Sequence, residues 1–173
     1  MKKVLLVYWP EEGSVEKVAS KFAFRSERSN FKMVSVANVS VSDLQEYNNW
    51  IIGGSTVGSH VWQDADDSNI WFEFFKKLNK IDLTQKVVAF YGLGDQILYP
   101  HHFVDGLGVF QEEFETRKAN IVGQWPIDGY NFIDSDGMKN KMFFGLAIDE
   151  EHQPEKTDER IDDWLPLVQK HFK

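Results

Sequence analysis

Hydrophobic and polar positions along this chain follow two alternating patterns. Continuous apolar runs, as at Lys3–Tyr8 and Lys86–Tyr91, are typical of strands that are buried on both faces of a parallel sheet. The segments between such runs carry apolar residues at helical spacing, as at Val15, Val18 and Phe22. Strands that alternate with helices in this way predict a doubly wound α/β fold, in which a parallel sheet is covered by helices on both faces.

The pattern predicts five strands, five helical segments and one interruption. The strands are expected at residues 3–8, 31–36, 49–53, 86–91 and 120–123. The helical segments are expected at residues 14–25, 42–46, 68–78, 103–117 and 157–172. Residues 124–141 interrupt the fifth strand, and a strand pattern resumes at residues 142–148. We therefore expect one domain over residues 1–173, with an insertion at 124–141 and with ligands bound where the strands end.

The composition excludes several classes of function. A net charge of −8 and a pI near 5.1 argue against nucleic-acid binding, which needs clustered Lys and Arg. The same acidity suits docking on a basic partner surface, or solubility alone. The sequence has no cysteine for a disulfide or a thiolate site. No apolar run approaches the roughly 20 residues of a membrane helix, and no export signal is found, so the chain is expected in the cytoplasm.

Four segments in the second half of the chain carry a family resemblance. They are Gly92–Pro100 (Gly-Leu-Gly-Asp-Gln-Ile-Leu-Tyr-Pro), Gly123–Pro126, Phe144–Ala147 and Asp158–Ile161. In this order they resemble the long-chain flavodoxin family. The resemblance implies a five-stranded sheet in the order 2-1-3-4-5, an insertion that splits the fifth strand, and one non-covalent FMN. It also implies one-electron transfer between redox proteins, rather than the chemistry of an enzyme, and we expect a monomer.

The loop after the first strand departs from the family pattern. Flavodoxins place Ser/Thr-x-Thr-Gly-x-Thr here, and its hydroxyls and amides surround the FMN phosphate. In this chain Gly13 is kept, but the three hydroxyl positions hold Pro10, Glu12 and Val15. Ser14 offers a hydroxyl at a position that the pattern leaves free, and Pro10 has no amide donor.

Two effects oppose each other in this loop. Amides from Glu11 to Val15 can form an anion-binding nest at a helix N-terminus, and each hydrogen bond to a charged group contributes about 1.5–3 kcal/mol. A phosphate beside the carboxylates of Glu11 and Glu12 loses about 1 kcal/mol for each charge in water, and up to about 4 kcal/mol in a less polar setting. Alternatively, these acids complement the helix dipole in place of a ligand. FMN binding is therefore expected to be weaker than is usual for the family.

The second loop matches the family only in part. Its positions at the flavin are Ser55, Thr56, Val57 and Gly58. Flavodoxins commonly place a Trp at the position of Val57, stacked on one face of the isoalloxazine ring. Val57 cannot stack. Trp9 and Trp62 are candidates for that face, although packing in the core or at its rim is the more ordinary role for each.

The third loop keeps the family pattern. Its positions at the flavin are Gly92, Leu93, Gly94, Asp95 and Tyr99. Tyr99 corresponds to the aromatic residue that covers the other ring face, and Asp95 to a residue whose backbone amide approaches the flavin pyrimidine. Glycines allow a close approach of the backbone to a planar ligand.

Two functions remain open on the sequence. The first is a flavodoxin-type electron carrier that binds FMN and docks redox partner proteins at the flavin edge, as the intact third loop favours. The alternative is a flavodoxin-fold binding module that has lost FMN, as the altered first loop favours.

Overall fold

The computed structural model describes residues 2–57 and 70–173. Its main sheet has the order β2-β1-β3-β4-β5, with β9 also paired to β4, and every pair is parallel. The strands are β1 (Val4–Trp9), β2 (Phe31–Ser35), β3 (Asn49–Gly54), β4 (Val87–Leu93), β5 (Asn120–Val122) and β9 (Leu146–Ile148). The predicted order 2-1-3-4-5 is confirmed.

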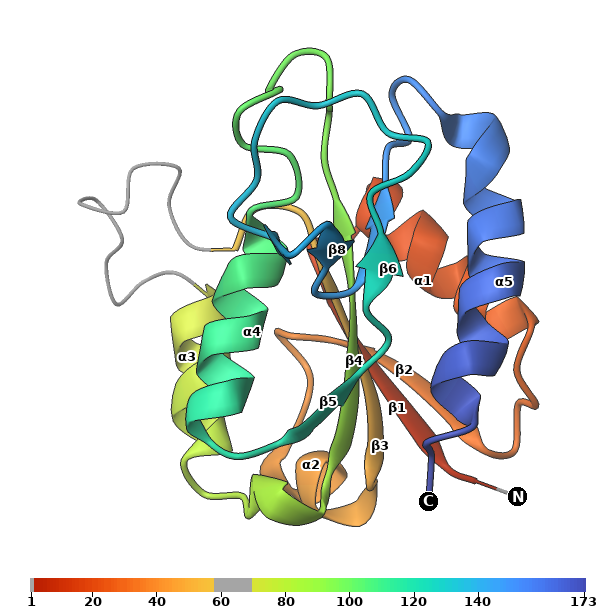
Figure 1. The fold of residues 1–173 in the computed structure, drawn as a ribbon. Helices are drawn as coiled ribbons and strands as arrows, with labels where there is room; N and C mark the ends of the chain where they lie inside the picture. Colours follow the sequence, from red (N-terminus) through yellow and green to blue (C-terminus); the bar gives the residue numbers. More distant parts are fainter. Residues whose placement is uncertain (1, 58–69) are drawn as a thin grey trace.

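Helices cover both faces of this sheet (Figure 1). On one face lie α1 (Ser14–Phe24) and α5 (Thr157–Gln169), and on the other lie α2 (Val41–Glu46), α3 (Ile70–Leu78) and α4 (Gly106–Thr116). Short 3-10 helices occupy Leu83–Gln85 and Pro154–Lys156. The predicted start of the third helical segment, at residue 68, lies outside the described residues. Among the described residues, no helix is both long and apolar enough to cross a membrane.

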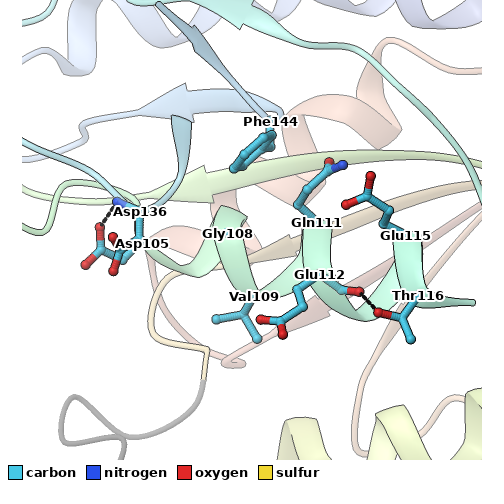
Figure 2. Close-up of a pocket in the computed structure, with 9 residues that line it drawn as sticks. All are labelled: Asp105, Gly108, Val109, Gln111, Glu112, Glu115, Thr116, Asp136 and Phe144. Carbon is cyan, nitrogen blue, oxygen red and sulfur yellow. Dashed lines mark hydrogen bonds between the residues drawn. The ribbon is translucent and has the colours of Figure 1, made fainter. Parts of the chain in front are cut away.

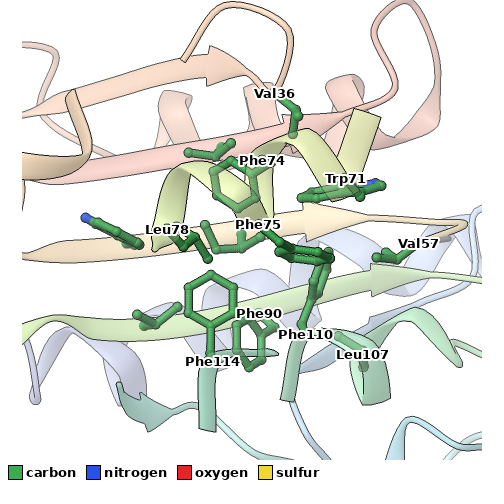
Figure 3. Packing of buried hydrophobic residues seen from close by; sticks show 14 of the residues in the cluster. Val36, Val57, Trp71, Phe74, Phe75, Leu78, Phe90, Leu107, Phe110 and Phe114 are labelled. Carbon is green, nitrogen blue, oxygen red and sulfur yellow. The ribbon is translucent and has the colours of Figure 1, made fainter. Parts of the chain in front are cut away.

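The two-sided core explains the continuous apolar strands. Along β1, Leu5 and Val7 point into the core beneath α2, α3 and α4, whereas Leu6 and Tyr8 point into the core beneath α1 and α5. Figure 3 shows the aromatic side chains of the first core interleaving between α3, α4 and the sheet. A strand with apolar partners on both faces has no polar side, so its sequence reads as an unbroken run.

The fifth strand is divided between two segments. β5 pairs with Val87–Ala89 of β4, and β9 pairs with Tyr91–Leu93 farther along the same strand. Gly123, at φ +88°, ends β5, and its carbonyl accepts a hydrogen bond of 2.7 Å from the indole of Trp164 on α5. Residues 123–145 lie between the two segments, whereas the insertion was predicted at residues 124–141.

Part of the predicted strand at 142–148 belongs elsewhere. The structure splits it, because β8 (Met142–Phe143) joins a separate antiparallel sheet with β6 (Trp125–Pro126) and β7 (Met138–Lys139). A two-residue turn with positive φ at Asn140 and Lys141 closes the β7–β8 hairpin. Gly145 lies between β8 and β9, where a Cβ would lie 2.3 Å from the carbonyl oxygen of Phe90. The prediction of one continuous strand at residues 142–148 was therefore wrong.

The helix predicted at 103–117 begins three residues later, at Gly106. Val104 has a φ of +51°, which is not helical, and its side chain is buried in the core. Tertiary packing at Val104 therefore sets the start of α4, which the apolar spacing did not reveal.

Candidate functional site

Three loops meet at the carboxyl-terminal edge of the sheet. The strand register aligns Trp9 of β1 with Gly54 of β3, and Gly54 with Gly92 of β4. The segments that follow are the first loop (residues 10–13), the second loop (from residue 55) and the third loop (residues 94–105). Of the second loop, residues 55–57 are described, and the predicted site residue Gly58 lies outside the described part. Parallel α/β sheets bind ligands at such an edge.

The first loop leads into the N-terminus of α1. Gly13 is the N-cap residue, and it supplies no side chain to the helix. Within residues 2–57 and 70–173, no hydrogen bond involves the amides of Gly13, Ser14 or Val15. Because the first N–H groups of a helix have no acceptor within it, these amides are available to an anion.

The two acids predicted to oppose a phosphate are directed to solvent. Glu11 and Glu12 are both exposed, and Glu11 Oε1 accepts a hydrogen bond of 3.3 Å from Asn38 Nδ2. Val15 is 2% exposed and packs in the core, so only its backbone can face a ligand. Water screens exposed carboxylates, so their repulsion of an anion bound here would fall at the low end of the expected range.

A different acid lies in the first loop. Glu16, in the first turn of α1, accepts one hydrogen bond from the amide of Glu12 and another, at 3.0 Å, from the hydroxyl of Tyr8. Burial raises the pKa of Tyr8 to about 12, and the hydrogen bond to Glu16 adds to the shift. Glu16 was not among the residues predicted for this site. The available signal was a Glu three residues after the N-cap, a position from which side chains reach back to the preceding backbone.

The second loop turns its central side chain inward. Val57 is 4% exposed, and a Cβ built on Gly106 would lie 2.9 Å from Val57 Cγ2, so Val57 packs against the start of α4. Ser55 is half-buried and Thr56 is exposed. Trp9 packs partly buried against the same core, and Trp62 lies outside the described residues. Val57 therefore has no free face for a ring.

The third loop is held by the side chain of Asp95. Its Oδ1 accepts hydrogen bonds from the amides of Ile97, at 3.0 Å, and Leu98, at 2.7 Å, and pairs with His152 Nε2 at 2.8 Å. Burial raises the pKa of Asp95, but these amides and His152 outweigh it and hold the pKa below its usual value. The Asp95 carboxylate is thus committed to the loop, which leaves its backbone amide to approach a ligand.

A buried polar network joins the third loop to β9 and the insertion. Asp149 is 0% exposed and accepts two hydrogen bonds from Gln96, at 3.1 Å from its amide and 2.9 Å from its side chain. The amides of Glu151 and His152 each donate to the other oxygen of Asp149 at 3.0 Å. The amide of Asn131 donates to Gln96 Oε1. This bracing was not predicted, because it joins residues far apart in the sequence.

The other predicted positions of the third loop differ in exposure. Tyr99 is 55% exposed, at the tip of the loop. Gly92 and Leu93 are buried, and a Cβ on Gly92 would lie 2.8 Å from Leu107 Cγ on α4. A Cβ on Gly94 would lie 2.9 Å from the amide nitrogen of Val104. The two glycines therefore allow close packing inside the protein, whatever they do for a ligand.

A separate surface cavity of about 360 Å³ lies along α4 (Figure 2). Its walls carry four carboxyl groups, and one of them, Asp105, accepts a hydrogen bond of 2.8 Å from the amide of Asp136. Phe144 closes the cavity on the side of the insertion. So many acids make this cavity unsuited to a phosphate. In the described part of the chain, no cluster of three His, Asp or Glu residues is arranged to hold a metal ion.

Comparison with known proteins identifies the family. The flavodoxin profile matches residues 6–164. A flavodoxin of Nostoc sp. is 35% identical over 173 residues, which cover 99% of this chain and 98% of the relative. The chain belongs to the flavodoxin family. Flavodoxin 1 of Escherichia coli K12 is 34% identical over 164 residues, 94% of this chain and 90% of that protein.

A solved flavodoxin extends the likeness to the whole fold. The crystal structure of Fusobacterium nucleatum flavodoxin bound to flavin mononucleotide has a TM-score of 0.86 to this chain. The two share 29% sequence identity, and the alignment covers 100% of both chains. The flavodoxin-like α/β fold predicted from the sequence is therefore confirmed.

The predicted site residues of this flavodoxin fall into two groups. The residues at the carboxyl-terminal edge with exposed or half-buried surfaces are Glu11, Glu12, Gly13, Ser14, Ser55, Thr56, Gly94, Asp95 and Tyr99. Val15, Val57, Gly92 and Leu93 have buried side chains or positions. The first group can present amides and an aromatic ring to a ligand, whereas the second group supports the loops from within.

Proposed function

We propose that this chain is an electron carrier that binds FMN without a covalent bond and passes single electrons between redox proteins. The observation that carries the proposal is the full-length similarity to a flavodoxin whose crystal structure holds flavin mononucleotide. Bound FMN would supply the one-electron chemistry, while the protein positions it and adjusts its surroundings. On this proposal the chain is not an enzyme, and nothing in the comparisons favours a flavin-free binding module.

The residues at the carboxyl-terminal edge fit a flavin phosphate. The amides of Gly13, Ser14 and Val15, at the positive end of α1, have no partner among the described residues and supply donors for an anion. The hydroxyl groups of the family pattern are missing, so the phosphate would depend on backbone donors and on Ser14. We therefore expect FMN affinity below that usual for the family.

The third loop supplies the ring site in this proposal. Tyr99 is exposed and can stack on the isoalloxazine, and the Asp95 amide can face its pyrimidine. Ile97, Leu98 and Ile133 are also exposed, and the amide of Ile133 donates to the carbonyl of Pro100 at 2.7 Å. These exposed apolar side chains, on the third loop and on the segment bonded to it, offer a surface suited to redox partners. We further propose a cytoplasmic monomer, and size-exclusion chromatography with light scattering tests its oligomeric state.

Replacing Tyr99 with Ala should weaken FMN binding. An aromatic pair contributes about 0.5–1.5 kcal/mol beyond its buried area, so we expect the dissociation constant to rise about fivefold. Quenching of FMN fluorescence during titration measures it. Phe24→Ala, which removes an aromatic ring that is 89% exposed on α1, is the matched control and should change nothing. Equal affinities of wild type and Tyr99→Ala would remove Tyr99 from the site.

Electron transfer itself has a direct test. Protein loaded with FMN and reduced anaerobically should reduce ferric cytochrome c, a one-electron acceptor, with two ferric haems reduced for each fully reduced flavin. Stopped-flow absorption of the haem and the flavin follows both partners. Protein without FMN should be inactive. Reduced FMN-loaded protein that does not reduce cytochrome c, or that releases the flavin before transfer, would contradict the proposed carrier.

A further inference from the structure

We propose that Glu16 is an internal competitor for the flavin phosphate and sets how strongly the first loop prefers a phosphorylated flavin. The inference rests on the proposed FMN function and adds a residue that determines ligand specificity. It follows from the contacts of Glu16, which differ from those of the two acids that the sequence suggested.

Glu16 already accepts hydrogen bonds from two donors at this loop, next to the amides proposed for the phosphate. Its Oε2 accepts the amide of Glu12, and its Oε1 accepts the hydroxyl of Tyr8 at 3.0 Å. Glu12 has a φ of +60°, the left-handed conformation that turns neighbouring amides toward one concave side. Tyr8 is 6% exposed, so its hydroxyl has few alternatives to this carboxylate. The Glu16 carboxylate is therefore a built-in anion at the mouth of the nest.

Neighbouring acids lack this geometry. Glu11 and Glu12 are exposed, and the one side-chain hydrogen bond of the pair among the described residues joins Glu11 to Asn38, although the charge of Glu11 also helps to raise the pKa of Tyr8. Glu16 is half-buried and lies in the first turn of α1, which also contains Ser14 and Val15, whose amides have no partner in the described part of the chain. A phosphate on those amides must either displace the Glu16 carboxylate or share the loop with its charge. Either arrangement weakens binding, and the weakening applies only to a ligand that carries a phosphate.

Neutral replacements of Glu16 should therefore tighten FMN selectively. In Glu16→Gln the side chain keeps its length and its hydrogen-bonding groups but loses its charge. We expect the FMN dissociation constant to fall about tenfold, as removal of one nearby like charge implies, while riboflavin, which has no phosphate, binds as before. Glu16→Ala, which also frees the Glu12 amide, should act in the same direction.

The control is Glu27→Gln, which removes the same charge from an exposed position after α1. Isothermal titration of FMN and riboflavin into the four proteins gives the ratio of the two affinities, and thermal melting checks that each variant is folded. The Tyr8 ring, followed by NMR, supplies a second readout. Its pKa, raised to about 12 by burial and by Glu16, should fall in Glu16→Gln.

The outcomes separate this inference from the proposed function. A gain for FMN alone in both Glu16 variants, absent from Glu27→Gln, supports the inference. FMN binding to a Glu16 variant but not to wild type would also support it, while contradicting the proposed carrier. Equal gains for FMN and riboflavin, or no gain in either Glu16 variant, would overturn the inference whether or not wild type binds FMN.

Discussion

Replacing Asp149 with Asn is expected to lower the free energy of unfolding by about 3 kcal/mol, because removal of one buried charged partner leaves others unsatisfied. The Asp149 carboxylate accepts four hydrogen bonds, two from Gln96 and one each from the amides of Glu151 and His152. An Asn at this position turns an NH₂ group toward two donors. Urea denaturation followed by circular dichroism measures the loss.

The same substitution should weaken FMN binding, since Gln96 connects the third loop to the insertion through Asn131. Asp163→Asn, at an exposed position on α5, is the matched control and should change neither stability nor affinity. An Asp149→Asn protein as stable as wild type would show that the network does not brace the loop. Normal FMN affinity in a destabilised variant would show that the brace is separate from the ligand site.

A methyl group at Gly53 is expected to lower the free energy of unfolding by about 3 kcal/mol or more, the upper range for overpacking a core. A Cβ there would lie 1.8 Å from Cζ of Tyr91, whose ring is fully buried against Phe22 with centroids 5.2 Å apart. The hydroxyl of Tyr91 also donates to the carbonyl of Val15 at 3.1 Å. A displaced ring therefore disturbs the first turn of α1 as well as the core, and urea denaturation measures the loss.

A compensating change tests this explanation. Gly53→Ala combined with Tyr91→Val removes the clash, so the double variant should lose less stability than the two single variants together. Gly13→Ala is the control for the clash, since a Cβ there meets nothing within 4 Å and the backbone is extended, and it should cost only the roughly 1 kcal/mol of a less favourable N-cap residue. Additive losses at Gly53 and Tyr91 would show that the contact between them does not set the cost.

The sequence predicted the fold well because its strands are buried on both faces. β1, β3 and β4 appear as continuous apolar runs, and their helices have clear apolar stripes. The errors lie where tertiary contacts decide the backbone. The segment predicted as one strand at 142–148 divides between two sheets, and Val104 delays the start of α4 by adopting a positive φ. Neither feature leaves a periodic signal in the sequence.

The convergence of the three loops was predicted correctly, whereas the side-chain contacts within them were not. The three loops do lie on adjacent strands, because parallel strands end at one edge of the sheet. The electrostatics of the first loop differ from the prediction. Glu11 and Glu12 are exposed, whereas Glu16 accepts hydrogen bonds from the Tyr8 hydroxyl and the Glu12 amide. Asp149 was missed because two of its hydrogen bonds come from Gln96, which lies 53 positions away in the third loop. Side-chain direction and long-range pairing are properties of the fold.

Titration of the purified, flavin-free protein with FMN tests the central claim most directly. Calorimetry and the visible flavin spectrum should show saturable binding of one FMN per chain, with a shifted and structured absorption band from a ring held in a protein site. Riboflavin should bind to the same site, with an affinity closer to that of FMN than the family's hydroxyl-rich phosphate loop would allow. A protein that shows no heat and no spectral change with FMN in large excess would contradict the account.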